Sequence, residues 1–241
     1  MTINLEKQDV LYTEKIYAVI CARGGSKRVK RKNVLLVHGK PLIVHTIELS
    51  KSCKLFDDVI VNSEDAEILQ IAEQLGVTTY KRPGSLALDT IFLIDVIKEM
   101  IDSMKLDDSQ IIGILFPTCP LRSIEDIENA LSLFMENGGD TPVVSVTSYE
   151  YPIQVALNIR EDNRLEPVFP EDYQRSTRHN AHKKSYHANY SIIFNTVGNL
   201  KKQINLIGND PIPYIMPYER SIDIDEPFQL KIAKALLAFK E

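Results

Sequence analysis

Residues 16–33 read IYAVICARGGSKRVKRKN, and the interpretation of the whole chain starts from this stretch. Ile16–Cys21 is a short, nearly continuous apolar run, which is typical of a strand buried on both faces of a parallel sheet. The next twelve residues, 22–33, are polar and basic and contain two glycines. The stretch therefore predicts a parallel strand of an α/β sheet that leads directly into a loop suited to an anion.

Strand-like and helix-like patterns then alternate as far as residue 146. Short apolar runs predict strands over residues 59–61, 77–80, 111–116 and 143–146. Apolar residues at helical spacing predict helices over residues 41–49, 66–75, 91–104 and 124–135. This order of elements predicts a three-layer α/β domain with a parallel or mostly parallel sheet.

The alternation breaks between residues 149 and 186. This part is polar, contains Pro152, Pro167 and Pro170, and alternates weakly in the manner of antiparallel strands. We interpret it as an inserted arm, at about residues 149–188, that covers a site or docks on a second subunit. A strand at 191–195, an extended segment at 211–217 and a helix at 227–239 follow. We expect residues 1–15 to be a lead-in and residues 16–241 to form one domain.

Composition excludes several classes of protein. The chain has 241 residues with 28 Lys+Arg and 33 Asp+Glu, a net charge of −5, which argues against a general nucleic-acid binder. No apolar run approaches the ~18 residues that a membrane span requires, and the first 15 residues lack the apolar region of a signal peptide. Cys21, Cys53 and Cys119 are widely spaced and predict no disulfide framework. We expect a cytoplasmic protein with no nucleic-acid or membrane partner.

The loop at residues 22–33 concentrates positive charge in an acidic chain. Its basic residues are Arg23, Lys27, Arg28, Lys30, Arg31 and Lys32. Gly24 and Gly25 allow a tight turn and exposed N–H groups, so loop and charge together suit a polyphosphate. The loop matches neither the Walker P-loop pattern nor G-x-G-x-x-G. The alternative is a basic loop that is merely solvated.

Residues 221–227, SIDIDEP, carry the second signal. On a strand, the two-residue period would place Ser221, Asp223 and Asp225 on one face. Two neighbouring carboxylates repel each other unless a cation lies between them, and Mg²⁺ is the natural partner. The alternative is an acidic turn that caps the last helix, with Asp225 near the N-cap.

Two further loops carry polar groups. Residues 82–89, RPGSLALD, contain Arg82, which is suited to a phosphate, and Asp89, which is suited to capping a helix or holding a turn. Residues 116–122, FPTCPLR, follow a predicted buried strand, where open α/β sheets place ligands. For both loops a purely structural role is the alternative. The chain has no G-x-S-x-G motif and no cysteine typical of a nucleophile, which disfavours covalent hydrolase chemistry.

Together and in this order, these segments resemble the acylneuraminate cytidylyltransferase family, which comprises the CMP-sialic acid synthetases and their relatives acting on sialic-acid-like sugars. The resemblance is carried by ARGGSKR, KN, GKPL, RPGSLALD, FPTCPLR and SIDIDEP, and it extends over residues 16–237. It implies a Rossmann-like nucleotidyltransferase domain with a protruding dimerisation arm, and a homodimer. It also implies the substrates, CTP and a nonulosonic acid, and the products, a CMP-sugar and pyrophosphate.

The resemblance also assigns residues to roles. The residues implied to bind the nucleotide are Ala22, Arg23, Gly24, Gly25, Ser26, Lys27, Lys32, Asn33, Arg82 and Thr118. Asp223 and Asp225 are implied to hold Mg²⁺, and together with Arg23 and Lys32 they form the expected catalytic set. The residues expected to bind the sugar are Phe116, Arg175, Arg178 and Asn189, with one of the two arginines on its carboxylate.

The chain differs from the family's usual pattern on the side of the base and the sugar. Phe116 stands where the family has glutamine, Ile91, Phe92 and Leu93 stand where it has small or hydroxylated residues, and Tyr190 replaces a glycine. Residues 151–154 and 186–188 look closest to the pseudaminic branch, whereas residues 120–122 look closer to the sialic and legionaminic branches. Two other functions remain open, a D-x-D glycosyltransferase and a non-catalytic nucleotide- or sugar-binding homologue.

Overall fold

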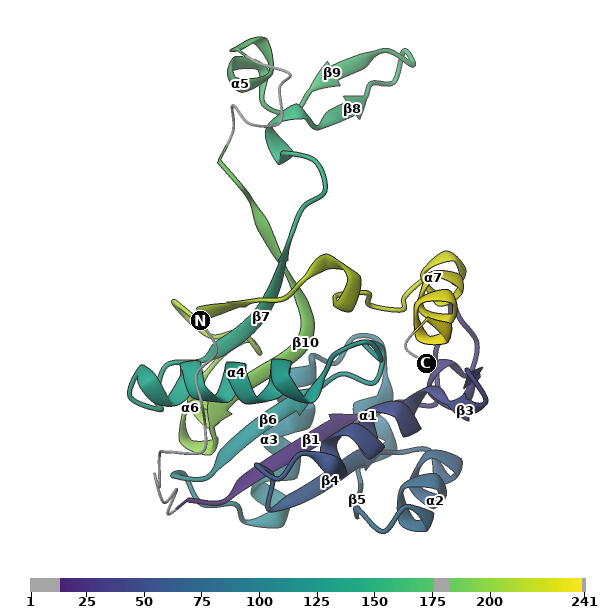
Figure 1. The fold of residues 1–241 in the computed structure, drawn as a ribbon, viewed down its shortest axis with the longest axis vertical. Helices are drawn as coiled ribbons and strands as arrows, with labels where there is room; N and C mark the ends of the chain where they lie inside the picture. The colour runs from purple at the N-terminus through teal and green to yellow at the C-terminus, as the bar shows by residue number, and fades with distance from the viewer. Residues whose placement is uncertain (1–13, 176–182, 240–241) are drawn as a thin grey trace.

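A mostly parallel sheet forms the centre of the molecule. In the computed structural model, which describes residues 14–175 and 183–239, seven strands pair in the order β11-β7-β10-β6-β1-β4-β5 (Figure 1). They are β1 (Ile16–Cys21), β4 (Asp58–Ser63), β5 (Thr78–Lys81), β6 (Ile111–Leu115), β7 (Val143–Ser148), β10 (Tyr186–Thr196) and β11 (Ile212–Ile215). Only β10 runs antiparallel to its neighbours in this described sheet. The predicted sheet is confirmed.

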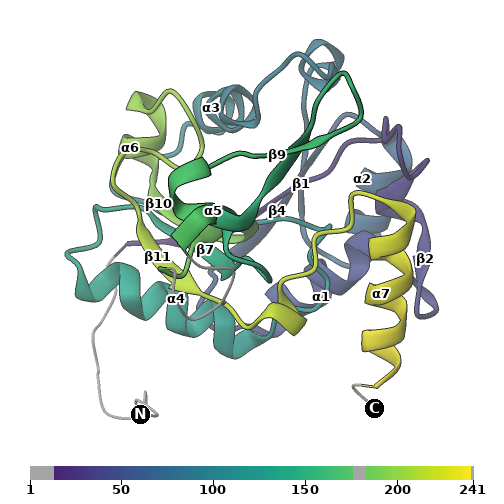
Figure 2. The ribbon, with the colours of Figure 1, turned by 90° about the horizontal axis from the view of Figure 1, so that it is seen from above.

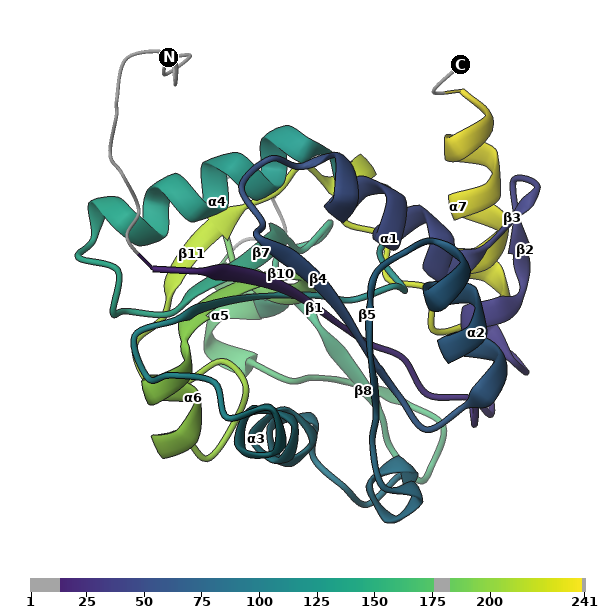
Figure 3. The same ribbon diagram turned by 90° about the horizontal axis from the view of Figure 1, so that it is seen from below.

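Helices cover both faces of this sheet. One face carries α1 (Leu42–Ser52), α2 (Ala66–Gln74) and α4 (Ile124–Glu136), and the other carries α3 (Leu93–Met104) and α6 (Val197–Lys202) (Figures 2 and 3). Strand β1 shows why, because Ala18 and Ile20 pack on the first set of helices whereas Val19 packs on the second. The three-layer α/β architecture expected from the sequence is confirmed.

A third, smaller hydrophobic cluster packs the C-terminal helix against the segment that follows the basic loop. The hairpin of β2 (Leu36–Val37) and β3 (Lys40–Pro41) lies beside α7 (Pro227–Ala238) (Figure 1). Ile224, which is fully buried, packs there with Val37, Leu42 and Leu121. Helix α7 begins at Pro227, and its N-cap is Glu226, which forms a capping box with Gln229. Asp225 directly precedes this N-cap, so it lies near the cap as the alternative expected, but Glu226 is the capping residue.

An arm extends from the far ends of β7 and β10 (Figure 1). It contains β8 (Leu157–Ile159), β9 (Leu165–Pro167) and the short helix α5 (Pro170–Arg175). The hairpin places Ile159 opposite Leu165, and both side chains are exposed, 73% and 64% respectively. Within the described ranges, no helix of the molecule is long and apolar enough to cross a bilayer.

Candidate active site

A cavity of about 700 Å³ opens at the carboxyl ends of β1 and β6. The chain passes from β1 to β4 and β5 on one side and then returns to β6 on the other, so this is the point where the strand order reverses. Open α/β sheets bind ligands at such points. The described residues that line it include Cys21, Arg23, Ser26, Lys27, Arg28, Lys32, Asn33, Arg82, Asp89, Ile91, Leu93, Phe116, Thr118, Asp223 and Asp225.

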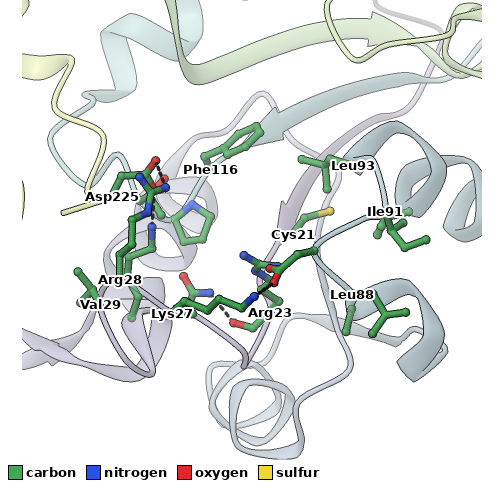
Figure 4. A pocket seen from close by; sticks show the side chains of 18 of the residues that line it. Cys21, Arg23, Lys27, Arg28, Val29, Leu88, Ile91, Leu93, Phe116 and Asp225 are labelled. Carbon is green, nitrogen blue, oxygen red and sulfur yellow. Dashed lines mark hydrogen bonds and ion pairs between the residues drawn. The ribbon is translucent and has the colours of Figure 1, made fainter. Parts of the chain in front are cut away.

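The basic loop and the chain's tail meet in this cavity (Figure 4). Lys32 Nζ lies 2.9 Å from Asp225 Oδ1 and also donates to the carbonyl of Ile224. Arg28 Nη2 lies 2.8 Å from Asp225 Oδ2, while its Nη1 lies 3.0 Å from Glu226 Oε1. Partial burial acts to raise the pKa of Asp225, but Lys32 and Arg28 outweigh it, so the net pKa lies below its usual value. Two segments almost 200 residues apart therefore share one site.

Asp223 has a different environment from Asp225. Its pKa is raised, chiefly by burial and also by the nearby charge of Asp225, against a hydrogen bond from the Thr118 hydroxyl. Its Oδ1 is buried and has no hydrogen-bond partner among the described residues. The expectation that these aspartates lie on a strand is wrong, because residues 221–225 form no regular element. Both nevertheless line the same cavity.

The aspartate pair fits a divalent cation. A buried carboxylate oxygen without a partner is costly and is the kind of group that a metal ion satisfies. Mg²⁺ is commonly held by one or two carboxylates, with substrate phosphates and waters as the other ligands. Among the described residues no group of three or more His, Cys, Asp or Glu side chains is placed to hold a metal, so phosphates and waters would have to complete the shell here.

Asp89 also lines the cavity. Its carboxylate accepts from Arg23 Nη1 and contacts Lys27 Nζ (Figure 4). Lys27 and then Arg23 lower the pKa of Asp89. Asp89 does not cap the following helix, since α3 begins at Leu93 with Phe92 as its N-cap. The suggested capping role is wrong, and the structure gives Asp89 the two cations of the basic loop as partners.

Beneath the loop lies a buried ion pair that fixes its path. Arg82 has a side chain only 4% exposed, and its Nη2 lies 2.6 Å from Glu64 Oε2. Glu64 Oε1 in turn accepts from the backbone N–H of Gly24 at 2.8 Å, and the carbonyl of Ala22 lies 3.5 Å from Arg82 Nη2. The charge of Arg82 is thus offset by Glu64. Ala22, Gly24 and Gly25, all expected to bind nucleotide, are not among the described residues that line the cavity.

Ser26 and Asn33 do line the cavity. Asn33 is buried and donates from Nδ2 to the carbonyl of Arg23 at 2.9 Å, while its Oδ1 has no partner among the described residues. The N–H of Ser26 lies 3.1 Å from the carbonyl of Gly24 and closes a tight turn there. A Cβ on Gly25 would meet nothing within 4 Å, so this face of the loop is open to a close approach.

The wall of the cavity that faces Asp223 and Asp225 is apolar. Leu88, Ile91 and Leu93 lie on one side of the cavity and Phe116 lies above it (Figure 4). The ring of Phe116 packs on that of Tyr190, with centroids 5.7 Å apart. Burial raises the pKa of the Cys21 thiol, which also lines this wall, to about 12. The wall therefore presents shape and apolar surface to a ligand, and its cysteine stays protonated.

Two of the expected sugar residues are not among those that line the cavity, and a third is not among the described residues. Asn189 is 2% exposed, and its side chain is bonded within the interior to Ser145 and Ser221. Arg175 ends α5 on the arm, and Arg178 lies outside the described residues. Of the expected sugar set, Phe116 is the residue placed at the cavity in the part of the chain that the structure describes.

Sequence reasoning missed two contributors to the site, Arg28 and Glu64, and singled out a third, Tyr190. Arg28 was one of six basic residues with nothing to distinguish it, and Glu64 gave no signal at all. Tyr190 has φ of 53°, in the left-handed region that favours glycine. The replacement of a family glycine at this position was the available signal for an unusual backbone.

Known proteins resemble this chain over most of its length. A family model described as cytidylyltransferase matches residues 17–205. The chain is 31% identical to the N-acylneuraminate cytidylyltransferase of Escherichia coli O18:K1:H7, with 91% of this chain and 51% of that protein covered. It is 30% identical to the pseudaminic acid cytidylyltransferase of Campylobacter jejuni, with 92% and 96% covered. The chain thus spans about half the length of the first relative and nearly all of the second.

A solved structure supports the fold. The CMP:2-keto-3-deoxy-manno-octonic acid synthetase complexed with CTP superposes with a TM-score of 0.68 at 17% identity, covering 95% of this chain and all of that one. At this identity the likeness shows the fold alone, whereas the family model and the relatives above cover most of the sequence. On these grounds the chain belongs to the cytidylyltransferase family.

Proposed function

We propose that the protein transfers the cytidylyl group of CTP to a sialic-acid-like nonulosonic acid and releases pyrophosphate. The observation that carries this proposal is the meeting of the basic loop with Asp223 and Asp225 in one cavity. The relatives named for N-acylneuraminate and for pseudaminic acid support the class of the sugar.

The reaction forms a bond from the sugar's anomeric oxygen to the α-phosphorus and breaks the bond from that phosphorus to the β-phosphate oxygen. The anomeric hydroxyl loses its proton, and pyrophosphate leaves in line. Positioning and charge neutralisation supply most of the rate in such a transfer. Arg23, Lys27 and Lys32 would bind the triphosphate and take up the charge of the departing pyrophosphate.

Asp223 and Asp225 would hold Mg²⁺ in this proposal. The bound ion would polarise the α-phosphate and stabilise its developing charge. The buried, unpartnered Oδ1 of Asp223 supports this assignment. The Asp225 carboxylate already forms ion pairs with Lys32 and Arg28. These two side chains would keep it ionised and oriented before the nucleotide binds.

The arm supports a homodimer. Leu157, Ile159, Leu165 and Pro167 share one face of the β8–β9 hairpin, because they occupy directly paired positions at two-residue spacing. A two-stranded hairpin is marginal alone, and the arm stands away from its own sheet (Figure 1). We therefore propose that a second copy of the chain covers this face, as closed two-fold symmetry is the commonest arrangement of identical subunits.

The glycosyltransferase alternative is less favoured. Such enzymes consume a sugar linked to a nucleoside diphosphate. The basic loop offers several cations at one end of the cavity and suits a triphosphate better than a diphosphate. A non-catalytic homologue would keep the cavity but lose turnover. Pyrophosphate release distinguishes the three functions, because only the proposed transferase produces it from CTP and a free sugar acid.

The decisive experiment is a panel of pyrophosphate-release assays. It crosses CTP, UTP, ATP and GTP with N-acetylneuraminic, legionaminic, pseudaminic and 3-deoxy-octulosonic acids, each with and without Mg²⁺. We expect release with CTP, a nonulosonic acid and Mg²⁺ together, and a CMP-sugar product by mass spectrometry. No release in any combination would refute the proposed function.

A further inference from the structure

The segment that carries Asp223 and Asp225 lies outside the sheet, so individual contacts hold it in place. Ser221, at its start, is buried, and its Oγ accepts a hydrogen bond from Asn189 Nδ2 at 2.9 Å. The Ser221 hydroxyl donates to the carbonyl of Pro217 at 2.8 Å. Further along, the N–H of Ile224 donates to the carbonyl of Thr118 at 2.9 Å. The position of both aspartates therefore depends on what holds Ser221 and Thr118.

Asn189 bonds one of those anchors and a sequence neighbour of the other. Its side-chain Nδ2 donates to Ser221, and its main-chain carbonyl accepts at 3.4 Å from the Sγ of Cys119, the residue after Thr118. Its Oδ1 accepts from the Ser145 hydroxyl at 2.5 Å and from the N–H of Ser191 at 3.2 Å. With both ends of its amide bonded, the Asn189 side chain is fixed in one orientation.

An irregularity in β10 turns Asn189 toward the tail. The register of β10 against β7 shifts between Ala188 and Ile193, and Tyr190 has its φ of 53° within this shift. Bulges beside active sites commonly redirect a side chain, and left-handed non-glycine residues cluster at functional sites. Here the buried side chain of Asn189 donates a hydrogen bond to Ser221, whereas the ring of Tyr190 packs on Phe116 at the cavity wall.

We propose that Asn189 is a positioning residue, which holds Ser221 and the Thr118 loop so that Asp223 and Asp225 can bind a divalent metal with the nucleotide. This rests on the proposed function in that the metal and CTP are its ligands. Asn189 itself does not line the cavity, so it acts through the two segments that it bonds. Residues that orient metal ligands from behind commonly affect metal affinity strongly.

Mn²⁺ binding in the presence of CTP tests this role without any turnover. Electron paramagnetic resonance of free Mn²⁺ gives the dissociation constant for each variant. We expect Asn189→Ala to raise it by about 10- to 100-fold. Ser221→Ala, which removes the hydroxyl that accepts from Asn189 and donates to Pro217, should raise it by about five-fold. Asn195→Ala is the matched control, because Asn195 is equally buried in β10 but bonds Gln203, and it should stay within about two-fold of the wild type.

The two substitutions also form a double-mutant cycle. If Asn189 acts through Ser221, adding Ser221→Ala to Asn189→Ala should change Mn²⁺ affinity very little. Wild-type Mn²⁺ affinity in Asn189→Ala, or an equal loss in Asn195→Ala, would overturn the proposal. If Asn189→Ala does not fold, Ser221→Ala decides, and unchanged affinity in that variant overturns it. A wild type that binds Mn²⁺ and CTP but forms no CMP-sugar would refute the proposed function alone.

Discussion

At the scale of single residues, the two aspartates of the tail differ although only one position separates them. The pKa of Asp223 is raised, chiefly by burial, whereas Lys32 and Arg28 hold the pKa of Asp225 below its usual value. Asp225 is therefore a charged carboxylate whose cationic partners are already in place. Asp223 has an oxygen that still lacks a partner, so a cation and this carboxylate stabilise each other.

Asp225→Ala tests the metal assignment. We expect at least about a hundred-fold loss of kcat/KM that excess Mg²⁺ does not restore, because both a metal ligand and the partner of Lys32 are lost. Pyrophosphate release measured across a wide range of Mg²⁺ concentrations provides the test. Glu226→Gln is the matched control, since Glu226 also pairs with Arg28 but is not among the lining residues. Near-normal turnover in Asp225→Ala would remove Asp225 from the metal site.

At the scale of elements, the start of α2 and the basic loop are packed together at Gly24. A Cβ there would overlap the Asp65 carboxylate, which caps α2 by accepting from the N–H groups of Glu67 and Ile68 and also pairs with Arg31. Gly24→Ala should therefore lower the free energy of unfolding by about 1–2 kcal/mol, roughly what a lost N-cap costs.

Gly25→Ala serves as the control for that substitution, because nothing lies within 4 Å of its added Cβ. Denaturant unfolding of the protein without nucleotide should leave this variant within about 0.5 kcal/mol of the wild type. Equal stability of the two variants would show that the loop moves freely away from α2.

A second connection between elements joins α4 to the turn before the aspartates. Arg220 donates from Nε and Nη2 to the fully buried Asp126 carboxylate, both at 2.8 Å. Burial acts to raise the pKa of Asp126, but hydrogen bonds from Arg220 and Ser123 outweigh it, so the net pKa is lowered. A carboxyl with a lowered folded-state pKa stabilises the protein above its unfolded value of about 4, and this is lost as pH falls through the folded value.

Asp126→Asn should therefore be less stable than the wild type at neutral pH, by about 2–3 kcal/mol, because Arg220 loses its charged partner. The difference between the two proteins should shrink as the pH falls below about 4, where the wild-type carboxyl becomes protonated. Urea unfolding at a series of pH values measures it. A difference that stays constant with pH would mean that the Asp126 charge does not contribute.

The sequence predicted regular elements better than it predicted the site. Apolar runs such as Ile16–Cys21 gave the buried strands, because a parallel sheet excludes water from both faces. The prediction of a strand at residues 221–225 was wrong. Alternation of polar and apolar residues there is equally compatible with an irregular segment that Ile224 anchors in the core. The antiparallel direction of β10 carries no signature in the side chains of residues 191–195, because they too are buried on both faces.

Residue roles at the site depended on distant partners. Asp89 bonds Arg23 across 66 positions of sequence, and Arg82 is neutralised by Glu64, so neither role follows from local pattern. Asn189 was expected at the sugar, but the bulge beside it turns its amide into the interior. The order of motifs in the sequence showed which charged and polar residues could form a site. Which of them pair with one another could be seen only in the folded structure.

At the scale of the whole molecule, the topology assembles the cavity from distant parts of the chain. The first strand, the loop after β5, the loop after β6 and the tail all end at the same edge of the sheet. The arm leaves the sheet along β7 and returns along β10, whose bulge carries Asn189 and Tyr190. Strand β10 is thus both one of the two connections to the arm and the element whose Tyr190 packs on Phe116 of the cavity wall.

The proposed dimer can be tested on the arm. Replacing both Ile159 and Leu165 with Glu would place two charges on the exposed apolar face, and burying unpaired charges in an interface costs several kcal/mol. We expect the wild type to sediment as a dimer and the double variant as a monomer, with a dissociation constant raised at least about a hundred-fold. Asn158→Glu, which adds charge to the opposite face of the hairpin, should leave the dimer intact. A monomeric wild type, or a double variant that still dimerises, would show that a second copy does not cover this face.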